Sequence, residues 1–314
     1  MKLGIIKSNF PDEKRVPLLP QDIGSFPNKL YIQTGLGNEL NIPDKAYEEK
    51  GAIITTKATI FKECDGIFSL KLIQKEDYHL IRENQIIIGW THPLGSGKYF
   101  MEQQALPKNL IVVDLDNRFP TLFYQNTQKR IKWIPTNFVR ENSFYAGYAG
   151  TLHALLSYGL LPTSNERIAI LGSGNVSQGA FYALFKFGTQ VTMFYRRTLP
   201  EFKNCLSDFD IIINGIEVGE RGQSILSLAE QQTLKDGCFI IDIAADAGNA
   251  IKNDKFTSIK KPIYFEDNHC IYCVPNTPTL AYRNVSKILS KQFSKYIFSK
   301  DIEDFKWCLK NDET

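Results

Sequence analysis

The sequence predicts an α/β fold with two doubly wound, Rossmann-like domains and a cleft between them. Three observations support this prediction. The chain has 314 residues, which is about two average domains of roughly 150 residues each. Short apolar runs alternate with helical patterns along most of the chain. A Gly-rich turn between an apolar strand and a helical pattern, within residues 167–180, starts a second series of such elements near the middle of the chain.

The first series of elements occupies residues 1–138. Short apolar and β-branched runs predict strands, with helical stretches such as Lys45–Lys50 and Lys98–Gln104 between several of them. The predicted strands are Lys2–Ile6, Leu30–Gln33, Ile53–Thr55, Gly66–Leu70, Gln85–Gly89 and Leu110–Leu115. We expect a hairpin next, with strands Thr121–Tyr124 and Arg130–Ile134 around the turn-prone pair Asn126-Thr127.

A helix rich in small residues is predicted at Asn142–Tyr158, followed by a polar turn. The strands predicted after it are Arg167–Leu171, Gln190–Tyr195, Asp210–Asn214, Cys238–Ile243, Pro262–Phe265 and Cys270–Val274. The last helical pattern, Thr279–Phe298, follows the final strand. A chain that ends this way often returns to its first domain. We therefore expect a discontinuous substrate domain, residues 1–138 plus 280–314, and a cofactor domain, residues 139–279.

Composition and charge exclude several classes of protein. The chain is 43% hydrophobic and carries a formal net charge of +3 from scattered charges, so neither a nucleic-acid nor a membrane partner is indicated. The N-terminal apolar run is too short for a signal peptide, and no stretch reaches the roughly 18 apolar residues of a membrane helix. We therefore expect a cytoplasmic protein with free thiols. Cys270 and Cys273 have no second cysteine pair to complete a zinc site, so no metal is predicted.

The Gly-rich turn predicts a dinucleotide site. The apolar run Ile168–Leu171 leads into Gly172, Ser173 and Gly174, and a helical pattern begins with Asn175 and Val176. The first glycine of such a turn permits a tight bend, and the second lets the backbone approach a pyrophosphate at the positive end of the helix. The third glycine of this motif is replaced by another small residue, Ser177. The alternative is a Gly-rich turn that binds no nucleotide.

The end of the next strand predicts which dinucleotide is bound. An acidic residue at this point normally bonds the ribose 2′-hydroxyl of NAD. Here the strand ends in Arg196 and Arg197 instead. Guanidinium groups match the oxygens of a 2′-phosphate, so the sequence favours NADP (NADPH) over NAD. The alternative for both arginines is a solvated positive patch.

Separated motifs, in the same order along nearly the whole chain, resemble the alanine dehydrogenase and saccharopine dehydrogenase superfamily. These are Lys14–Pro20, Thr34–Asn38, Ile67–Lys71, Gly89–Pro93, Gly172–Gly174, Ile241–Gly248 and Val274–Pro278. Longer matches, at Ser69–Gln74, Asn142–Gly150 and Ala244–Asn249, resemble a bacterial opine-type family that uses NADPH. This resemblance implies reductive condensation of pyruvate with the side-chain amine of L-ornithine or L-lysine, and a homo-oligomer.

The resemblance also implies roles for individual residues. Arg15 would bind the carboxylate of pyruvate, and Lys71 would contact its carboxylate or carbonyl and join proton transfer. His92 would be the acid that protonates or polarises the carbonyl oxygen, a role suited to a group that exchanges protons near neutral pH. The alternatives are a surface charge for Arg15, a solvated strand-end lysine for Lys71 and a structural histidine for His92.

Two further residues lie after predicted strands of the second series. Asp246 matches the catalytic aspartate of the superfamily, near the nicotinamide, with Asp242 as its competitor four residues earlier. Asn276 matches an asparagine near the nicotinamide ring, or else belongs to a simple turn. The segment Gly248-Asn249-Ala250 departs from the alanine dehydrogenase pattern, which casts doubt on ammonia as the amine. The alternative functions are ammonia-dependent alanine dehydrogenase, saccharopine dehydrogenase, and a catalytically silent dinucleotide-binding protein.

Overall fold

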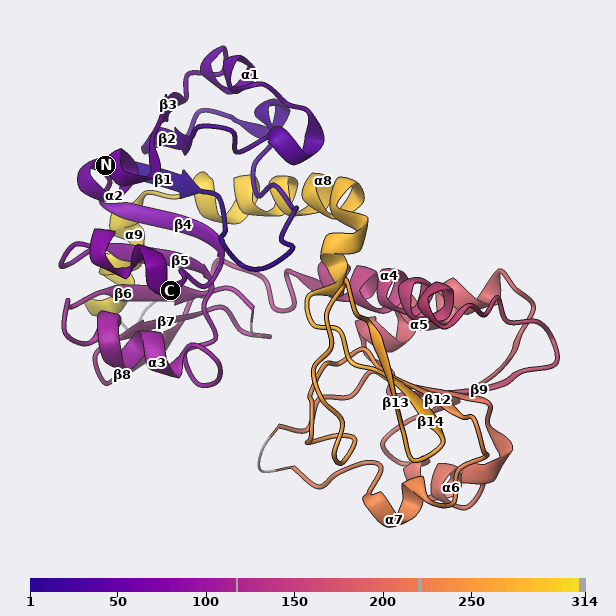
Figure 1. Cartoon of the computed structure of the whole chain (residues 1–314). Coiled ribbons are helices and arrows are strands. Elements are labelled where there is room, and N and C mark those ends of the chain that lie inside the picture. The colour runs from indigo at the N-terminus through magenta and orange to yellow at the C-terminus, as the bar shows by residue number, and fades with distance from the viewer. Residues whose placement is uncertain (117, 220–221, 311–314) are drawn as a thin grey trace. The chain divides into compact units, whose positions relative to one another are not determined.

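The computed structural model describes residues 1–116, 118–219 and 222–310 (Figure 1). The chain divides into two compact units. The first contains Met1–Val139 and Tyr282–Thr314, and the second contains Arg140–Ala281. Each unit has its own parallel-rich sheet with helices, so the predicted class of two Rossmann-like α/β domains is confirmed. The first unit is built from both ends of the chain.

An eight-stranded sheet forms the centre of the first unit, with strand order β3-β2-β1-β4-β5-β6-β7-β8. Neighbouring strands from β3 to β6 are parallel, and β7 and β8 form an antiparallel edge. The strand order reverses between β1 and β4, the place where α/β sheets usually bind their ligands. The strands are β1 (Lys2–Ile6), β2 (Lys29–Gln33), β3 (Ile53–Thr55), β4 (Gly66–Lys71), β5 (Ile86–Trp90), β6 (Ile111–Asp114), β7 (Thr121–Tyr124) and β8 (Thr127–Arg130).

The helical elements of this unit come from both ends of the chain. The N-terminal part supplies α1 (Asp44–Glu48), α2 (Lys57–Glu63) and α3 (Lys98–Phe100), and the C-terminal part supplies α8 (Tyr282–Phe293) and α9 (Ile302–Lys310). Short 3₁₀ segments are η1 (Pro20–Asp22), η2 (Asn38–Leu40) and η3 (Lys75–Leu80), and π-helical turns are η4 (Met101–Ala105) and η7 (Ser294–Phe298). Figure 1 shows α8 and α9, in yellow, beside the indigo and purple strands.

The hairpin prediction is wrong for its second strand, which is Thr127–Arg130 and not Arg130–Ile134. Tyr124 pairs with Thr127, so only Gln125 and Asn126 form the turn. Two-residue turns suit the twist of a hairpin. The side chains of β8 are mostly exposed at the sheet edge, whereas Ile131 is fully buried. The apolar residues therefore lie after the observed strand, which is why the predicted strand was placed too late in the sequence.

Helix α8 fixes the segment that follows β1. Phe68 in β4 packs edge-on against Phe293 and Phe298, with ring centroids 4.9 and 5.0 Å away. The backbone N–H groups of Val16 and Leu19 donate to the hydroxyls of Ser286 and Ser290, each at 2.8 Å. The C-terminal return of the chain thus holds the loop that carries Arg15.

The second unit has a six-stranded sheet of order β10-β9-β11-β12-β14-β13, in which only β13 runs antiparallel to its neighbour. Its strands are β9 (Arg167–Leu171), β10 (Gln190–Phe194), β11 (Ile211–Asn214), β12 (Phe239–Asp242), β13 (Ile263–Glu266) and β14 (His269–Tyr272). The helices are α4 (Arg140–Tyr158), α5 (Asn175–Phe185), α6 (Leu199–Lys203) and α7 (Leu228–Gln231), with turns η5 (Leu206–Asp208) and η6 (Thr277–Ala281).

Helices α4 and α5 approach each other closely because glycines meet backbone at their contact. A Cβ atom on Gly147 would lie 1.8 Å from the Val176 carbonyl oxygen, and one on Gly179 would lie 1.9 Å from that of Phe144. No side chain fits at either place. This contact fixes the N-terminal turn of α5, just after the Gly-rich segment.

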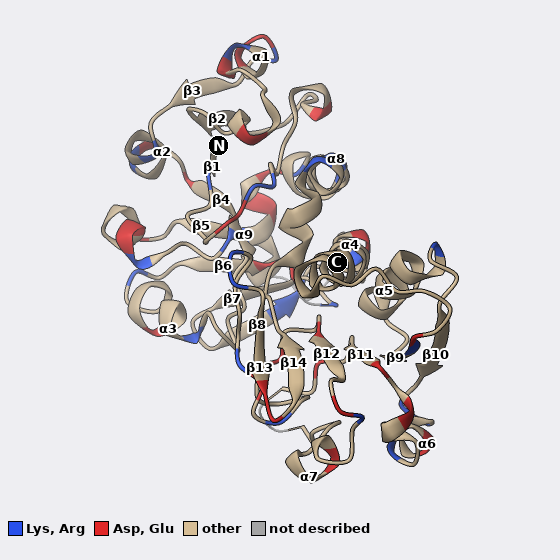
Figure 2. Cartoon of the chain, turned by 45° about the vertical axis from the view of Figure 1, so that its right-hand side comes forward, with Lys and Arg blue, Asp and Glu red and all other residues tan. Residues whose placement is uncertain are grey.

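The surface and the cysteines agree with the composition. Lys and Arg are interspersed with Asp and Glu in both units (Figure 2). Across the part of the chain that the structure describes, no helix has the length and apolar character to cross a membrane. All six cysteines are free thiols, as expected.

Candidate active site

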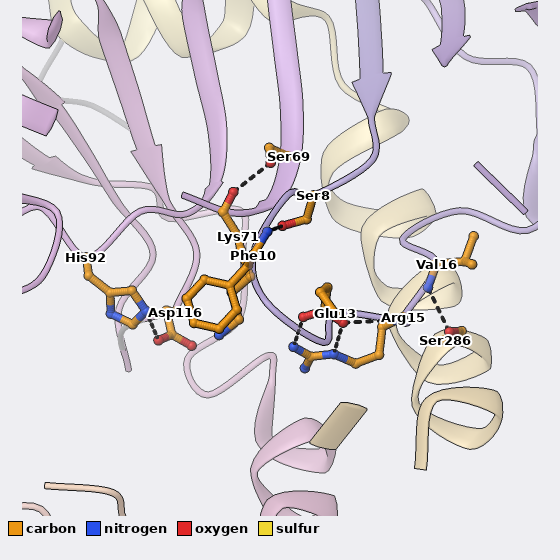
Figure 3. A network of polar contacts seen from close by, with 10 residues as sticks. All are labelled: Ser8, Phe10, Glu13, Arg15, Val16, Ser69, Lys71, His92, Asp116 and Ser286. Atoms are coloured by element: carbon orange, nitrogen blue, oxygen red, sulfur yellow. Dashed lines mark hydrogen bonds and ion pairs between the residues drawn. The ribbon is translucent and has the colours of Figure 1, made fainter. Parts of the chain in front are cut away.

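Arg15 is buried and bound to a carboxylate that the sequence analysis did not single out. Its side chain is 0% exposed and that of Glu13 is 2% exposed. The Arg15 Nε and Nη2 donate to the two oxygens of Glu13 at 2.8 and 2.5 Å, and the Arg15 backbone N–H donates to the same carboxylate at 2.9 Å (Figure 3). The nearby guanidinium outweighs the effect of burial and lowers the pKa of Glu13. One edge of Arg15 is therefore occupied by Glu13.

Arg15 and Lys71 both lie close to the ring of Trp90. The Arg15 guanidinium lies 4.7 Å from the centre of this ring, and the Lys71 ammonium lies 5.0 Å from it and 5.4 Å from the ring of Phe10. Aromatic faces attract cations, so buried rings can hold both charges. Burial first, and then the charge of Arg15, lowers the pKa of Lys71 to about 8. Lys71 stays mostly protonated at neutral pH and can lose its proton under mildly basic conditions.

A bulge at the end of β4 directs Lys71. The pairing of β4 with β5 changes register between Ser69 and Lys71, and the Ser69 hydroxyl donates to the Lys71 carbonyl oxygen at 2.6 Å. Bulges of this kind commonly redirect a side chain next to a functional site. Gly89 in β5 has φ +157°, and a Cβ there would lie 1.8 Å from the Ser69 carbonyl oxygen. The two strands can approach this closely only with glycine at position 89.

His92 lies in a constrained turn after β5, with φ +44°. Its backbone N–H and that of Thr91 donate to the buried Asp114 carboxylate, at 3.2 and 3.0 Å. Its carbonyl oxygen accepts from the N–H groups of Gly95 and Gly97, at 3.0 and 2.9 Å. A positive φ is unusual for histidine, and such conformations persist only where the surroundings enforce them.

The imidazole of His92 is paired with Asp116. The Nε2 atom lies 3.0 Å from the Asp116 Oδ2 atom, and the two side chains are 38% and 30% exposed (Figure 3). Burial disfavours the charged ring, but the hydrogen bond and charge of Asp116 outweigh it, so the pKa of His92 is raised. The pKa of Asp116 is lowered, because the same contact outweighs its burial. The pair thus favours imidazolium beside carboxylate.

The structure brings Arg15, Lys71 and His92 together, along with partners that sequence reasoning missed: Phe10, Glu13, Trp90, Asp114 and Asp116. A signal for the two aspartates was present, because Asp114 ends β6 and Asp116 follows it, beside the end of β5. The carboxyl ends of neighbouring parallel strands meet at one sheet edge.

The Gly-rich turn of the second unit fits a dinucleotide pyrophosphate. Gly172 has φ +104°, and a Cβ there would lie 2.7 Å from the Ser177 hydroxyl. Gly174 caps α5, and a Cβ there would meet open space, which leaves the first turn of the helix accessible. Ser173, Gly174 and Asn175 are exposed, and Val176 is half-buried. This turn follows β9, where the strand order of the sheet reverses.

Ser177, in place of the third glycine, packs against the strand. Its buried hydroxyl donates to the Leu171 carbonyl oxygen at 3.0 Å. Arg196 and Arg197 lie in the turn after β10, which is the strand next to β9, and both are exposed. The Tyr195 N–H donates to the Thr198 hydroxyl at 2.8 Å and so closes this turn. Both arginines therefore follow the strand that lies next to the one leading into the Gly-rich turn.

Asp246 lies after β12, in the second unit, and its carboxylate is already hydrogen-bonded to neighbouring groups. It is 8% exposed. Its carboxylate accepts hydrogen bonds from the N–H groups of Val218 and Gly219, at 2.7 and 2.9 Å, and from the Asn249 amide at 2.9 Å. These bonds tie the loop after β11 to the loop after β12. Asn276 is half-buried, with φ +63°, in the turn before η6.

Asp242, the competitor of Asp246, belongs to a buried group with Asp254 and Cys273. The potential ligand atoms of the three lie within 4.8 Å of one another, a spacing at which a metal ion could be considered. Burial and the charge of Asp254 raise the pKa of Asp242 to about 7, and burial raises that of the Cys273 thiol. The group supports the Asp246 loop: Asp242 accepts from the Asp246 N–H at 3.0 Å, and Asp254 from the Gly248 N–H.

Comparison with known proteins places this architecture in one class. The model of the alanine dehydrogenase/PNT N-terminal domain matches residues 4–117, and that of the C-terminal domain matches residues 186–314. An L-alanine dehydrogenase has a similar structure, with a TM-score of 0.76 and 18% identity, covering 95% of this chain and 89% of its own. A transhydrogenase from Sinorhizobium meliloti has a TM-score of 0.75 and 16% identity, covering 96% of each chain. The chain is an oxidoreductase with the alanine dehydrogenase fold.

More similar relatives define the family within this class. The N(5)-(carboxyethyl)ornithine synthase of Lactococcus lactis subsp. lactis is 54% identical over 97% of this chain and 98% of its own. The enzyme of that name from Clostridium botulinum is 52% identical over 96% of each chain. Alanine dehydrogenase 1 of Staphylococcus aureus is 21% identical over 100% of this chain and 91% of its own. The chain belongs to the N(5)-(carboxyethyl)ornithine synthase family, and the resemblance seen in the sequence motifs is confirmed.

The buried carboxyl pair predicts a pH-dependent stability. The folded-state pKa of Asp242, about 7, is above its ordinary value. The folded protein therefore keeps a proton that the unfolded chain loses, and stability falls as the pH rises from about 4 to 7. In Asp254→Asn the neighbouring charge is removed. The free energy of unfolding of the variant relative to wild type should rise between pH 5 and pH 8, by an amount on the order of 2 kcal/mol.

Urea unfolding at the two pH values measures this difference, with the exposed Asp236→Asn as control. If the free energies of unfolding of wild type and Asp254→Asn change in parallel across this pH range, the charge of Asp254 does not raise the pKa of Asp242.

Proposed function

We propose that the protein condenses pyruvate with the side-chain amine of L-ornithine or L-lysine and reduces the product with NADPH. The products would be N5-(1-carboxyethyl)-L-ornithine and the N6-lysine analogue. The observation that carries this proposal is the gathering of Arg15, Lys71 and His92 around the ring of Trp90 and the carboxylate of Asp116. It occurs in a chain 54% identical to a relative named for this product.

Lys71 is the group best placed to bind the oxo acid. It is held by two aromatic rings, and no described residue accepts a hydrogen bond from its ammonium. Arg15 keeps one edge on Glu13 and adds a second positive charge over the same ring. A carboxylate and a carbonyl oxygen are both stabilised by such charges in a partly dry site.

His92 supplies and removes protons. Attack of the amine nitrogen on the ketone carbon forms a carbinolamine, and its hydroxyl leaves as water when an acid protonates it. The Nε2 of His92 is bonded to Asp116, and among the described residues none is bonded to its Nδ1. The hydrogen bond and charge of Asp116 raise the pKa of His92 and so favour the acid form of the ring. Loss of water leaves an imine whose carbon accepts a hydride.

The cofactor, when bound, supplies that hydride from its reduced nicotinamide. Gly172, Ser173, Gly174, Asn175 and Val176 would hold the pyrophosphate at the N-terminus of α5. Arg196 and Arg197 would bind the 2′-phosphate, which supports NADP over NAD.

Asp246 and Asn276 complete the proposed cofactor side. Asn276 would lie beside the nicotinamide. Asp246 would stabilise the positive iminium carbon and nitrogen through its negative charge, while its hydrogen bonds to Val218 and Gly219 fix the loop that carries it. We further propose small-molecule substrates and a cytoplasmic homo-oligomer; the interspersed charges of both signs favour neither a nucleic-acid nor a membrane partner.

The direct test is NADPH oxidation in the presence of pyruvate with L-ornithine, L-lysine or ammonium added separately, with the product identified by mass. We expect oxidation with ornithine or lysine and a carboxyethyl adduct as product. Oxidation with ammonium alone, giving alanine, would contradict the proposal and favour alanine dehydrogenase activity. A preference for 2-oxoglutarate over pyruvate would favour saccharopine dehydrogenase, and NADPH binding without turnover would favour a silent protein.

Replacing the acid tests the role of His92. His92→Ala should lower kcat by about a hundredfold or more, the usual contribution of general acid catalysis, with little change in the Kd of NADPH. The exposed His79→Ala is the matched control. Because the pKa of His92 is raised, wild-type kcat should fall as the pH rises through a value above 6.5. Normal turnover in His92→Ala would remove this residue from the mechanism.

The choice of cofactor is tested by replacing Arg196 and Arg197 together with serine. The Kd of NADPH should rise by at least about tenfold, because charge-assisted hydrogen bonds to the 2′-phosphate are lost, whereas the Kd of NADH should hardly change. The exposed Arg140→Ser is the control. Fluorescence titration of both dinucleotides measures the effect, and equal losses for the two would argue against 2′-phosphate recognition.

A further inference from the structure

A pocket in the first unit has no role in the chemistry described so far. Its enclosed volume is about 70 Å³, and the pocket opens to solvent. Its walls come from the end of β1, from the segment that carries Arg15 and from the loop after β2. Residues with charged or polar side chains dominate the lining: Lys7, Glu13, Lys14, Arg15, Asn38 and Glu39. The side chains of Glu13 and Arg15 are themselves buried against each other, so Lys7, Lys14 and Glu39 supply the accessible charges. Both signs of charge are present, so the pocket suits a ligand that itself carries both.

The walls of this pocket are held in place by the fold. In the loop after β2, the Thr34 hydroxyl and the Gly35 N–H donate to the Asp44 carboxylate at 2.5 and 2.8 Å. Across the pocket, the Val16 N–H donates to Ser286. A pocket with fixed walls binds without a large ordering cost.

Two of the charged residues that line the pocket have no ion-pair partner among the described residues. Lys7 and Glu39 are exposed, and within residues 1–116, 118–219 and 222–310 neither forms an ion pair or a side-chain hydrogen bond. Glu13, by contrast, is already bonded to Arg15. The pocket therefore offers a cation and a carboxylate at its surface.

The pocket shares a wall with the oxo-acid site. Arg15 lines the pocket and also lies 4.7 Å from the Trp90 ring, over which Lys71 is held. Leu70 lines the pocket and directly precedes Lys71 in β4. The pocket therefore borders the two chain segments that carry Arg15 and Lys71, although the Arg15 side chain itself is 0% exposed.

We propose that this pocket binds the amino-acid end of the amine substrate, with Glu39 receiving its α-ammonium and Lys7 its α-carboxylate. This assignment rests on the proposed function. It identifies the α-ammonium and α-carboxylate as the groups of the amine substrate that the enzyme recognises. The side-chain amine would then extend toward the oxo acid at Lys71. Ammonia has no such end, so an enzyme specialised for ammonia has no use for this pair of charges.

The experiment combines two variants with two truncated amines. The amines are 1,4-diaminobutane, which is ornithine without the carboxylate, and 5-aminopentanoate, which is ornithine without the α-amine. We measure kcat and KM for each amine and for L-ornithine at saturating pyruvate and NADPH. The variants are Lys7→Gln and Glu39→Gln, with the exposed Lys50→Gln and Glu49→Gln as controls from the same unit.

Each variant should lose about tenfold in kcat/KM for L-ornithine, mainly through KM, as expected for one charged contact. Lys7→Gln should not impair use of 1,4-diaminobutane, and Glu39→Gln should not impair use of 5-aminopentanoate, because each amine lacks the group that the replaced residue reads. The KM of pyruvate should be unchanged in both. Equal losses for all three amines, or none, would overturn the subsite while leaving the reaction intact.

Failure of the proposed function is a separate result. If wild type turns over no amine with pyruvate, the proposed reaction is wrong. Calorimetric titration with L-ornithine then decides the subsite by itself. Binding that Lys7→Gln and Glu39→Gln weaken would support it, and absent or unchanged binding would overturn it.

Discussion

The buried ion pair between Arg15 and Glu13 is the interaction on which the polar site of the first unit depends. Burying a charge costs several kcal/mol unless it is paired and hydrogen-bonded. Here the guanidinium is held on one edge by Glu13 and on its face by Trp90. This arrangement fixes the loop after β1, which α8 holds from outside through Ser286. It also places a positive charge next to Lys71 and so contributes to the lowered pKa of that ammonium.

The buried ion pair of Arg15 and Glu13 lies near both regions where we propose that a substrate binds. Near Arg15, Lys71 ends β4 and His92 follows β5. Arg15 is also among the residues that line a pocket with charges of both signs. Asp114 accepts the backbone N–H of His92 and holds its unusual backbone conformation, while Asp116 pairs with the imidazole. Glycine at position 89 lets β5 approach β4 closely at the same edge of the sheet. One rigid unit thereby presents binding charge and an acid together.

Apolar periodicity predicted most of the fold, because buried parallel strands are nearly continuous apolar runs. The strands Lys2–Ile6, Ile53–Thr55 and Arg167–Leu171 are observed as predicted. It failed for β8, whose side chains are mostly exposed, and α9 was not predicted. The resemblance identified Arg15, Lys71 and His92, but not the carboxylates Glu13 and Asp116. Glu13 lies only two residues before Arg15, but this spacing does not reveal that both side chains are buried. Asp116 reaches His92 from a different loop, and such pairing leaves no local pattern. The hydrogen bonds of Asp246 to Val218 and Gly219 were invisible for the same reason.

The most direct test of this account is the effect of Glu13→Gln on the free energy of unfolding and on the KM of pyruvate. Removing one partner of a buried ion pair leaves an uncompensated charge, so stability should fall by about 3 kcal/mol and the KM of pyruvate should rise. Glu63→Gln, which breaks the half-exposed pair with Lys2, should change neither much. If Glu13→Gln is as stable as Glu63→Gln and binds pyruvate normally, the buried pair does not organise the site.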